Sequence, residues 1–176
     1  MSRVLETPVA LVGLMGAGKS VVARLLGARW VVEVADLDAR VESRCGMSIP
    51  MAFERLGEAW FREREIEALA GAVAEGAAVI DGGGGLVVDS ANRLLLRTRC
   101  RTVWLEVSPD VAAVRIAGDA GRRPLVSQEP SAPRLAAILK ARAPLYEEVA
   151  WLRAPTDGST PERVTDFLLD RLGVAR

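Results

Sequence analysis

The chain has 176 residues, half of them apolar, and its 23 basic side chains are balanced by 23 acidic ones, which gives no reason to expect a nucleic acid or an anionic membrane as a partner. It contains no histidine, which excludes a histidine-based catalytic triad or zinc site and leaves carboxylates as the candidate general bases. The length predicts a single domain over residues 1–176.

The first predicted elements enclose a phosphate-binding motif. An apolar run at residues 9–12 predicts a buried strand, and residues 21–26 have a helical pattern. Between them, Gly13 to Ser20 match the pattern G-x-x-x-x-G-K-S in the strand–loop–helix context that this motif requires. Lys19 would reach the β- and γ-phosphates, and the Ser20 hydroxyl would bind Mg²⁺. The alternative is a glycine-rich turn with an incidental Lys-Ser pair, but the four fixed residue types and both flanks favour a nucleoside triphosphate site.

The remaining predicted elements alternate between strand and helix. Strands are expected at residues 31–35, 77–80, 102–107 and 150–153, and helices at 48–75, 89–96, 110–117, 134–146 and 161–172. Ser48 is expected to cap the long helix, and Gly57 to break it. Residues 118–133 are rich in proline, glycine and charge, and we expect a mobile lid there.

This order of elements predicts an α/β fold. Alternating strands and helices give a three-layer arrangement, a five-stranded parallel sheet with helices on both faces, of the P-loop NTPase type and similar to the nucleoside monophosphate kinases. Because ligands of such sheets gather at the carboxyl ends of the strands, segments 13–20, 36–38 and 81–85 should converge.

The ends and the cysteines of the chain indicate a compartment. Glu6 and Pro8 interrupt any signal-peptide pattern, and no apolar stretch approaches the roughly 20 residues that span a bilayer. Cys45 and Cys100 lack metal or redox spacing, which fits a reducing environment. We therefore expect a soluble, cytoplasmic protein.

A phosphate-binding loop alone is compatible with kinases, GTPases, motors and transport ATPases. The guanine-specificity pattern N-K-x-D is absent, and the chain is shorter than most motor or transport ATPase domains. A kinase for a small metabolite remains.

Six ordered motifs closely resemble those of the shikimate kinases, from the strand before the loop to the last helix. They are Gly13 to Ser20; Asp36-Leu37-Asp38 with Val41-Glu42; Gly46 to Ile49 followed by the run from Phe53 to Glu65; Gly83-Gly84-Gly85; Arg123-Pro124-Leu125; and Arg142 with Pro144 and Tyr146. The resemblance implies ATP-dependent phosphorylation of the 3-hydroxyl of shikimate in aromatic amino-acid biosynthesis, with Mg²⁺ as the cofactor, and we expect a monomer. The nucleotide-binding residues so implied are Gly16, Ala17, Gly18, Lys19, Ser20, Val21, Arg115 and Arg123.

The resemblance also implies a site for the acid. Arg62 and Arg142 occupy the family's carboxylate-binding positions, which suits two planar guanidinium groups, and the backbone of Gly83, Gly84 and Gly85 approaches the ring hydroxyls. Taken alone, Arg62 would be interpreted as a solvated helix arginine. Within its motif, the acidic residue one turn further along can hold the guanidinium in place.

Lys19, Asp38 and Arg123 are the implied catalytic residues. Asp38 accepts a hydrogen bond from the attacking hydroxyl, either as a base or only to orient it, and Asp36 lies near Mg²⁺ through a water. On an extended strand end the two aspartates would point the same way, and the alternative is that they cap a helix from Ala39. Closure of the lid would bring Arg123 onto the transferring phosphoryl group.

Two positions depart from the family pattern. Where the family commonly carries a small residue, Asp81 follows four apolar residues in the form of a Walker B acid, and our hypothesis is an extra water-mediated contact to Mg²⁺ or to Ser20. The alternative is that Asp81 caps a turn. The position of the family's adenine-stacking arginine is Ile116, so Arg115 beside it becomes the adenine candidate, with the loop at residues 156–161 as the other wall.

Two competing functions are a related kinase for another polar acceptor such as gluconate, and a catalytically silent nucleotide-binding regulator. The first would not need both Arg62 and Arg142 beside the D-x-D pattern. The second would not need the complete set of catalytic residues.

Overall fold

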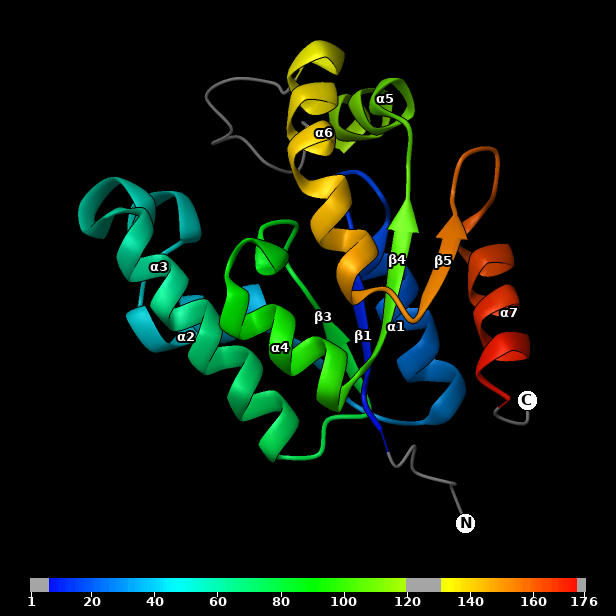
Figure 1. The fold of residues 1–176 in the computed structure, drawn as a ribbon, viewed down its shortest axis with the longest axis horizontal. Coiled ribbons are helices and arrows are strands. Elements are labelled where there is room, and N and C mark those ends of the chain that lie inside the picture. Colours follow the sequence, from blue (N-terminus) through cyan, green and yellow to red (C-terminus); the bar gives the residue numbers. More distant parts are fainter. Residues whose placement is uncertain (1–6, 120–130, 174–176) are drawn as a thin grey trace.

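The computed structural model describes residues 7–119 and 131–173, and its centre is a five-stranded parallel sheet (Figure 1). The strands, in the spatial order β2-β3-β1-β4-β5, are β1 (Val9–Val12), β2 (Val34–Asp36), β3 (Val79–Asp81), β4 (Arg101–Glu106) and β5 (Leu152–Pro155). The helices are α1 (Lys19–Trp30), α2 (Leu37–Cys45), α3 (Ile49–Ala74), the short 3₁₀ helix η1 (Leu86–Val88), α4 (Ser90–Arg99), α5 (Pro109–Asp119), α6 (Ala132–Val149) and α7 (Pro161–Leu172). The predicted five-stranded parallel sheet is confirmed.

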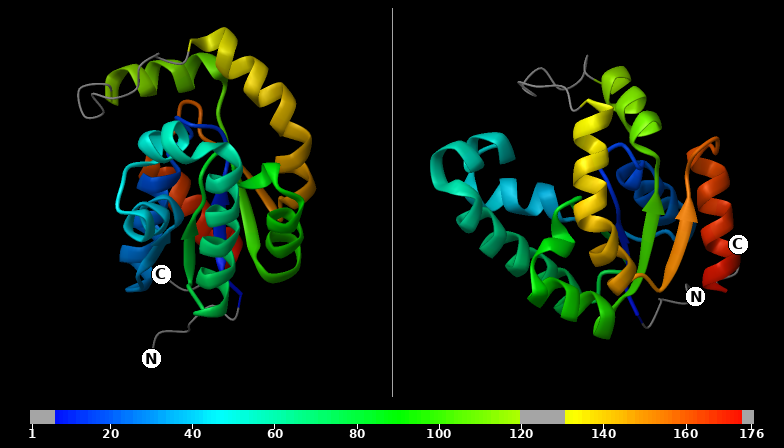
Figure 2. Two further views of the ribbon diagram at one scale, coloured as in Figure 1. Left: turned by 90° about the vertical axis from the view of Figure 1, so that its left-hand side faces the viewer. Right: turned by 45° about the horizontal axis from the view of Figure 1, so that its top comes forward.

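Helices cover both faces of the sheet, because successive side chains of each strand point to opposite sides. On β1, Val9 and Leu11 belong to a core formed mainly with α1, α5 and α7, whereas Ala10 and Val12 belong to a second core formed mainly with α3, α4 and α6. Figure 2 shows helices on either side of the sheet. All four side chains are fully buried, which explains why this strand is apolar throughout.

The region around β2 differs from the prediction. The strand begins later than residue 31, because Val31 has a left-handed conformation (φ 56°) and its N–H ends α1 by bonding to the carbonyl of Gly27. At the other end, the Asp36 carboxylate caps α2 by accepting a hydrogen bond from the N–H of Ala39 (3.0 Å), and Asp38 lies in the first turn of that helix. The placement of Asp38 on an extended strand end is therefore wrong, whereas Asp36 is both the last residue of β2 and the cap of α2.

Other boundaries moved by a few residues. β3 continues to Asp81 because this residue still pairs with β1 and β2, and α3 breaks at Gly57 (φ 83°, ψ 168°), as predicted. α5 continues to Asp119 and α6 begins at Ala132, so both ends of the predicted lid at 118–133 are helical. Residues 120–130, which include Arg123, lie outside the described residues. None of the described helices has the length and apolarity needed to cross a membrane.

Candidate active site at the carboxyl edge of the sheet

The P-loop, residues 13–20, joins β1 to α1 and is closed on itself by its lysine. The ammonium of Lys19 donates to the carbonyls of Gly13 (3.0 Å) and Leu14 (3.1 Å). These bonds join the end of the loop to its first two residues. Gly18 caps α1 with a left-handed backbone (φ 86°), so the first N–H groups of the helix follow the loop directly. No acidic residue lies in the first turn of α1, and its positive end is therefore available to an anion.

Two carboxylates lie beside this loop on neighbouring strands. Asp36 and Asp81 are directly opposite each other in the pairing of β2 with β3, and Asp81 is also opposite Leu11 of β1. The Ser20 side chain lies close enough to the Asp81 carboxylate to stabilise its ionised form. Burial raises the pKa of Asp81, while the Ser20 side chain and the charge of Lys19 lower it.

Asp38 extends from the start of α2 toward the turn that follows β3, residues 82–85, called here the glycine turn. A Cβ atom added to Gly83 would lie 3.1 Å from Oδ1 of Asp38 and 3.3 Å from Oε1 of Glu65. Burial, helped by the charges of Asp36 and of other nearby carboxylates, raises the pKa of Asp38 to about 6, against a lowering by Lys19. A carboxylate with a pKa near neutrality accepts a proton more readily than an ordinary aspartate.

Arg62 lies over the end of the glycine turn. A Cβ atom on Gly85 would be 2.5 Å from Nη1 of Arg62, so only glycine leaves room for the guanidinium. Glu65, which is 2% exposed, accepts from Nη1 (2.8 Å), and Glu58 accepts from Nε (3.3 Å) and Nη2 (3.0 Å). The predicted interaction of Glu65 with Arg62 is confirmed. Glu58 makes a second ion pair with Arg62, which the sequence did not predict.

Arg142 reaches the same turn from α6. Its Nη1 donates to the carbonyl of Gly84 (3.0 Å), and the hydroxyl of Tyr146 donates to the same carbonyl (2.6 Å). A Cβ atom on Gly84 would lie 3.2 Å from the carbonyl oxygen of Gly13. Two guanidinium groups from distant segments of the chain therefore meet at consecutive residues of one turn, and this turn touches the P-loop.

Arg115 joins α5 to the P-loop and to the loop after β5. Its Nη1 donates to the carbonyl of Gly16 (3.2 Å) and to Oγ1 of Thr156 (3.0 Å), and its Nη2 donates to the carbonyl of Thr156 (2.7 Å). Ile116, at the position of the family's stacking arginine, packs against the core on the α1 side of the sheet. The Arg115 guanidinium therefore lies at the junction of the two segments that were predicted to enclose the nucleotide.

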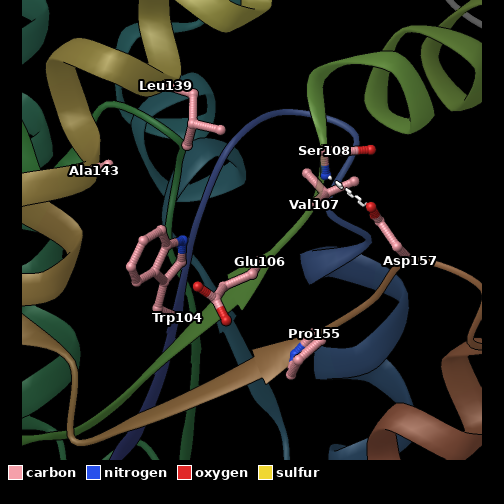
Figure 3. Close-up of a pocket in the computed structure, with 8 residues that line it drawn as sticks. All are labelled: Trp104, Glu106, Val107, Ser108, Leu139, Ala143, Pro155 and Asp157. Atoms are coloured by element: carbon pink, nitrogen blue, oxygen red, sulfur yellow. Dashed lines mark hydrogen bonds between the residues drawn. The ribbon is translucent and has the colours of Figure 1, made fainter.

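A cavity of about 370 Å³ lies outside this group of residues. It is bounded by β4, α6 and the chain after β5, and its lining residues are Trp104, Glu106, Val107, Ser108, Leu139, Ala143, Pro155 and Asp157. Figure 3 shows that the Asp157 carboxylate faces the start of α5, where it accepts from the N–H of Ser108 (3.1 and 3.2 Å). No P-loop residue lines this cavity. The candidate site is therefore assigned from its functional side chains and not from the cavity.

Comparisons with known proteins agree with the six motifs. The sequence model of the family described as "Shikimate kinase" matches residues 15–173. The chain belongs to the shikimate kinase family. A curated shikimate kinase from Frankia casuarinae is 45% identical over 165 residues, which cover 94% of this chain and 72% of that protein. One from Xanthomonas campestris pv. campestris (strain 8004) is 38% identical over 164 residues, covering 93% and 91% of the two chains.

Solved structures agree with the fold. The shikimate kinase of Acinetobacter baumannii in complex with shikimate superposes with a TM-score of 0.86 at 34% identity and covers 97% of this chain and 95% of that one. A gluconokinase from Sinorhizobium meliloti 1021 has a TM-score of 0.60 at 16% identity, covering 97% of this chain and 94% of that one. The second likeness shows a shared fold and no more.

Most of the predicted site residues of this shikimate kinase family member converge at one edge of the sheet. Lys19, Ser20, Asp36, Asp38 and Asp81 lie on or beside the P-loop, and the two arginines and three glycines of the acid site adjoin it. In the P-loop itself, Gly16 and Gly18 have positive φ and Ala17 is buried; Val21, which follows the loop in α1, is exposed. Arg123 cannot be placed, because it lies outside the described residues.

Proposed function

We propose that this protein transfers the γ-phosphoryl group of ATP to the 3-hydroxyl of shikimate, giving shikimate 3-phosphate and ADP in aromatic amino-acid biosynthesis. The observation that carries the proposal is the meeting of Arg62 and Arg142 at the glycine turn beside the P-loop. An acid gripped there would present its hydroxyls to the terminal phosphate of a nucleotide in the loop.

The two arginines supply the grip. Shikimate has one carboxylate, and each charge-assisted hydrogen bond to it contributes about 1.5–3 kcal/mol. Glu58 and Glu65 already hold the Arg62 guanidinium, so little conformational entropy is lost when the acid binds.

Asp38 receives the reacting hydroxyl. Its carboxylate lies beside Gly83 of the glycine turn, where it would accept a hydrogen bond from the 3-hydroxyl. That oxygen then forms the new bond to phosphorus as the bond from phosphorus to ADP breaks, and the hydroxyl proton passes to the Asp38 carboxylate, which later releases it to solvent. Positioning and charge neutralisation supply most of the acceleration in such a transfer.

Cations around the phosphates supply the neutralisation. Lys19 would exchange its loop carbonyls for the β- and γ-phosphates, and Arg123 would add a second charge. Mg²⁺ would be held by the Ser20 hydroxyl and, through water, by Asp36; the ion neutralises charge developing on the phosphate oxygens. These are hard oxygen donors of the kind that Mg²⁺ prefers. No group of three or more acidic or cysteine side chains in the described part of the chain could hold a metal by itself, so nucleotide phosphates and water must complete the shell.

The deciding experiment is phosphate transfer from ATP in a coupled assay with shikimate and gluconate at equal concentrations. We expect ADP release with shikimate, dependent on Mg²⁺, and negligible release with gluconate. A preference for gluconate would assign the chain to another acceptor, and tight ATP binding without turnover on any acid or sugar would make it a regulator.

Arg142→Ala tests whether this arginine binds the carboxylate of shikimate. We expect the KM for shikimate to rise about tenfold to one hundredfold, with the KM for ATP nearly unchanged, because about 1.4 kcal/mol corresponds to a factor of ten. An unchanged KM for shikimate would contradict the assignment. We further propose that residues 1–176 work as one catalytic domain and as a monomer in the cytoplasm, which light scattering and cell fractionation would test.

A further inference from the structure

Asp81 is the buried carboxylate at this edge for which the shikimate reaction gives no role. It ends β3, is 7% exposed, and lies in register between Asp36 of β2 and Leu11 of β1. Because Leu11 is in the strand that leads into the P-loop, the Asp81 carboxylate is placed beside the start of α1. An acid at the end of the strand next to the P-loop strand is the position from which P-loop NTPases hold Mg²⁺.

The Asp81 side chain is oriented toward the nucleotide end of the site. It lies close to the side chain of Ser20, the residue whose hydroxyl binds Mg²⁺ in P-loop proteins, and within electrostatic reach of Lys19 and Arg24. Asp36 and Asp89, by contrast, accept hydrogen bonds from backbone N–H groups at the starts of α2 and α4. Asp81 therefore lies beside the P-loop serine, whereas the other two acids cap helices.

We propose that Asp81 is part of the Mg²⁺–nucleotide site, where its carboxylate, together with Ser20 and Asp36, binds the ion's water shell. This rests on the proposed ATP-dependent function. All three donors are oxygen atoms, and the strand pairing places Asp36 and Asp81 opposite each other, so one cation between them relieves their repulsion.

The consequence is a nucleotide affinity that depends on the metal through Asp81. The experiment is isothermal titration calorimetry with ADP, once in excess Mg²⁺ and once in EDTA, on the whole chain. The ratio of the two dissociation constants measures what the metal adds to binding, and it does not require turnover or shikimate. We expect a large ratio for the unsubstituted chain.

Two substitutions separate the metal role from simple positioning of Ser20. Asp81→Asn keeps an oxygen that can accept a hydrogen bond from the serine but removes the charge, whereas Asp81→Ala removes both. We expect Asp81→Asn to lower the ratio about tenfold, which corresponds to about 1.4 kcal/mol of metal binding, while ADP affinity in EDTA stays equal or becomes tighter as a negative charge is lost. Asp81→Ala should lower the ratio at least as much.

The matched control is Asp89→Asn. Asp89 follows the glycine turn and η1 in the chain and caps the start of α4. Asparagine is an equally good helix cap. This substitution should leave the ratio unchanged. If Asp81→Asn also keeps the original ratio, Asp81 only positions Ser20 and the proposal is overturned; a ratio of one in the unsubstituted chain overturns it as well.

The near-isosteric asparagine keeps the test valid if the alanine variant fails to fold. The role of Asp81 in metal binding can also be tested independently of whether shikimate is the phosphate acceptor. A chain that shows no phosphate transfer to shikimate but retains an Asp81-dependent ratio would disprove the acceptor alone.

Discussion

Two glycine-rich segments meet at the carboxyl edge of the sheet, and they need glycine for different reasons. In the P-loop, Gly13, Gly16 and Gly18 have φ values of 143°, 79° and 86°, which side chains rarely adopt. The backbone path itself demands these residues, because the loop must turn its N–H groups inward around a phosphate.

In the glycine turn no residue from 82 to 85 has a positive φ. Glycine is needed there for space: a Cβ atom on Gly82 would lie 2.8 Å from the carbonyl oxygen of Leu11, and one on Gly85 would lie 2.5 Å from the Arg62 guanidinium. The first segment needs glycine for its conformation, with crowding added at Gly13 and Gly16, and the second needs it only because of what packs against it. Substitutions in the two should therefore fail in different ways.

The largest effect is expected from Gly13→Ala. The new Cβ would collide with the carbonyl oxygen of Leu105 in β4, a backbone atom held by the sheet, in addition to the cost of the positive φ. We expect a loss of about 3 kcal/mol or more, which lowers the Tm of a chain of this size by roughly 6–12 °C. Thermal unfolding of the nucleotide-free protein measures it.

Gly18→Ala separates the two costs. Gly18 also has a positive φ, but nothing lies within 4 Å of an added Cβ atom. Only the left-handed conformation should then cost free energy, about 1–2 kcal/mol. If both variants unfold at the same temperature, crowding by β4 contributes nothing and this account of Gly13 fails.

Much of this edge could be predicted from the sequence, because its signals are local. The P-loop has fixed residue types at fixed spacing, and the break at Gly57 follows from glycine in a helical pattern. The pairing of Arg62 with Glu65 needed only their separation of one helical turn. Each of these depends on residues a few positions apart.

The contacts that could not be predicted join distant parts of the chain. β5 begins at Leu152, later than its apolar run, and the backbone N–H of Trp151 just before it donates to the carbonyl of Thr102 in β4, a bond that only the assembled sheet shows. The contact of Arg115 with Thr156 likewise depends on where α5 packs. Asp38 was misplaced because local periodicity does not show that α2 begins directly after Asp36, the last residue of β2.

In the glycine turn the next largest effect is expected from Gly85→Ala. The guanidinium of Arg62 is the end of a flexible side chain, so it can move away from the new methyl group, and folding should change little. This movement takes the guanidinium out of the position in which Glu58 and Glu65 hold it for binding the carboxylate of shikimate. The KM for shikimate should therefore rise about tenfold to one hundredfold, while the KM for ATP stays constant.

Steady-state kinetics with each substrate varied in turn checks this result. Gly71→Ala, in α3, is the control, since a Cβ atom there meets only ordinary contacts, the nearest at 3.7 Å. A Gly85 variant that loses stability as Gly13→Ala does, and keeps its KM for shikimate, would show that the two glycine segments do not differ as described.

A smaller effect is expected from Tyr146→Phe. Phenylalanine keeps the ring stacked on Trp104, with centroids 5.5 Å apart in the present structure, but loses the hydrogen bond to the carbonyl of Gly84. The loss of about 1 kcal/mol should lower the Tm by roughly 2–4 °C, because Arg142 still donates to that carbonyl. The KM for shikimate should rise severalfold as Arg142 is held less firmly, and an unchanged Tm together with an unchanged KM would contradict this role.

The smallest effect is expected at the nucleotide end, from Arg115→Ala. Its guanidinium ties the P-loop at Gly16 to the loop at Thr156, so its removal should loosen both and raise the KM for ATP about threefold to tenfold, without changing the KM for shikimate. Arg115→Lys should restore little, because a single ammonium cannot make the forked contacts to both segments.

Competition with two inhibitors then decides how Arg115 acts. ADP carries an adenine base, whereas inorganic tripolyphosphate offers only phosphates to the P-loop. If Arg115 positions the P-loop, its removal weakens both inhibitors by similar factors; if it contacts adenine alone, only ADP is weakened. The bond to the Gly16 carbonyl leads us to expect the first result, which would make the arginine part of the conformational constraint on the P-loop and not a wall of the base pocket.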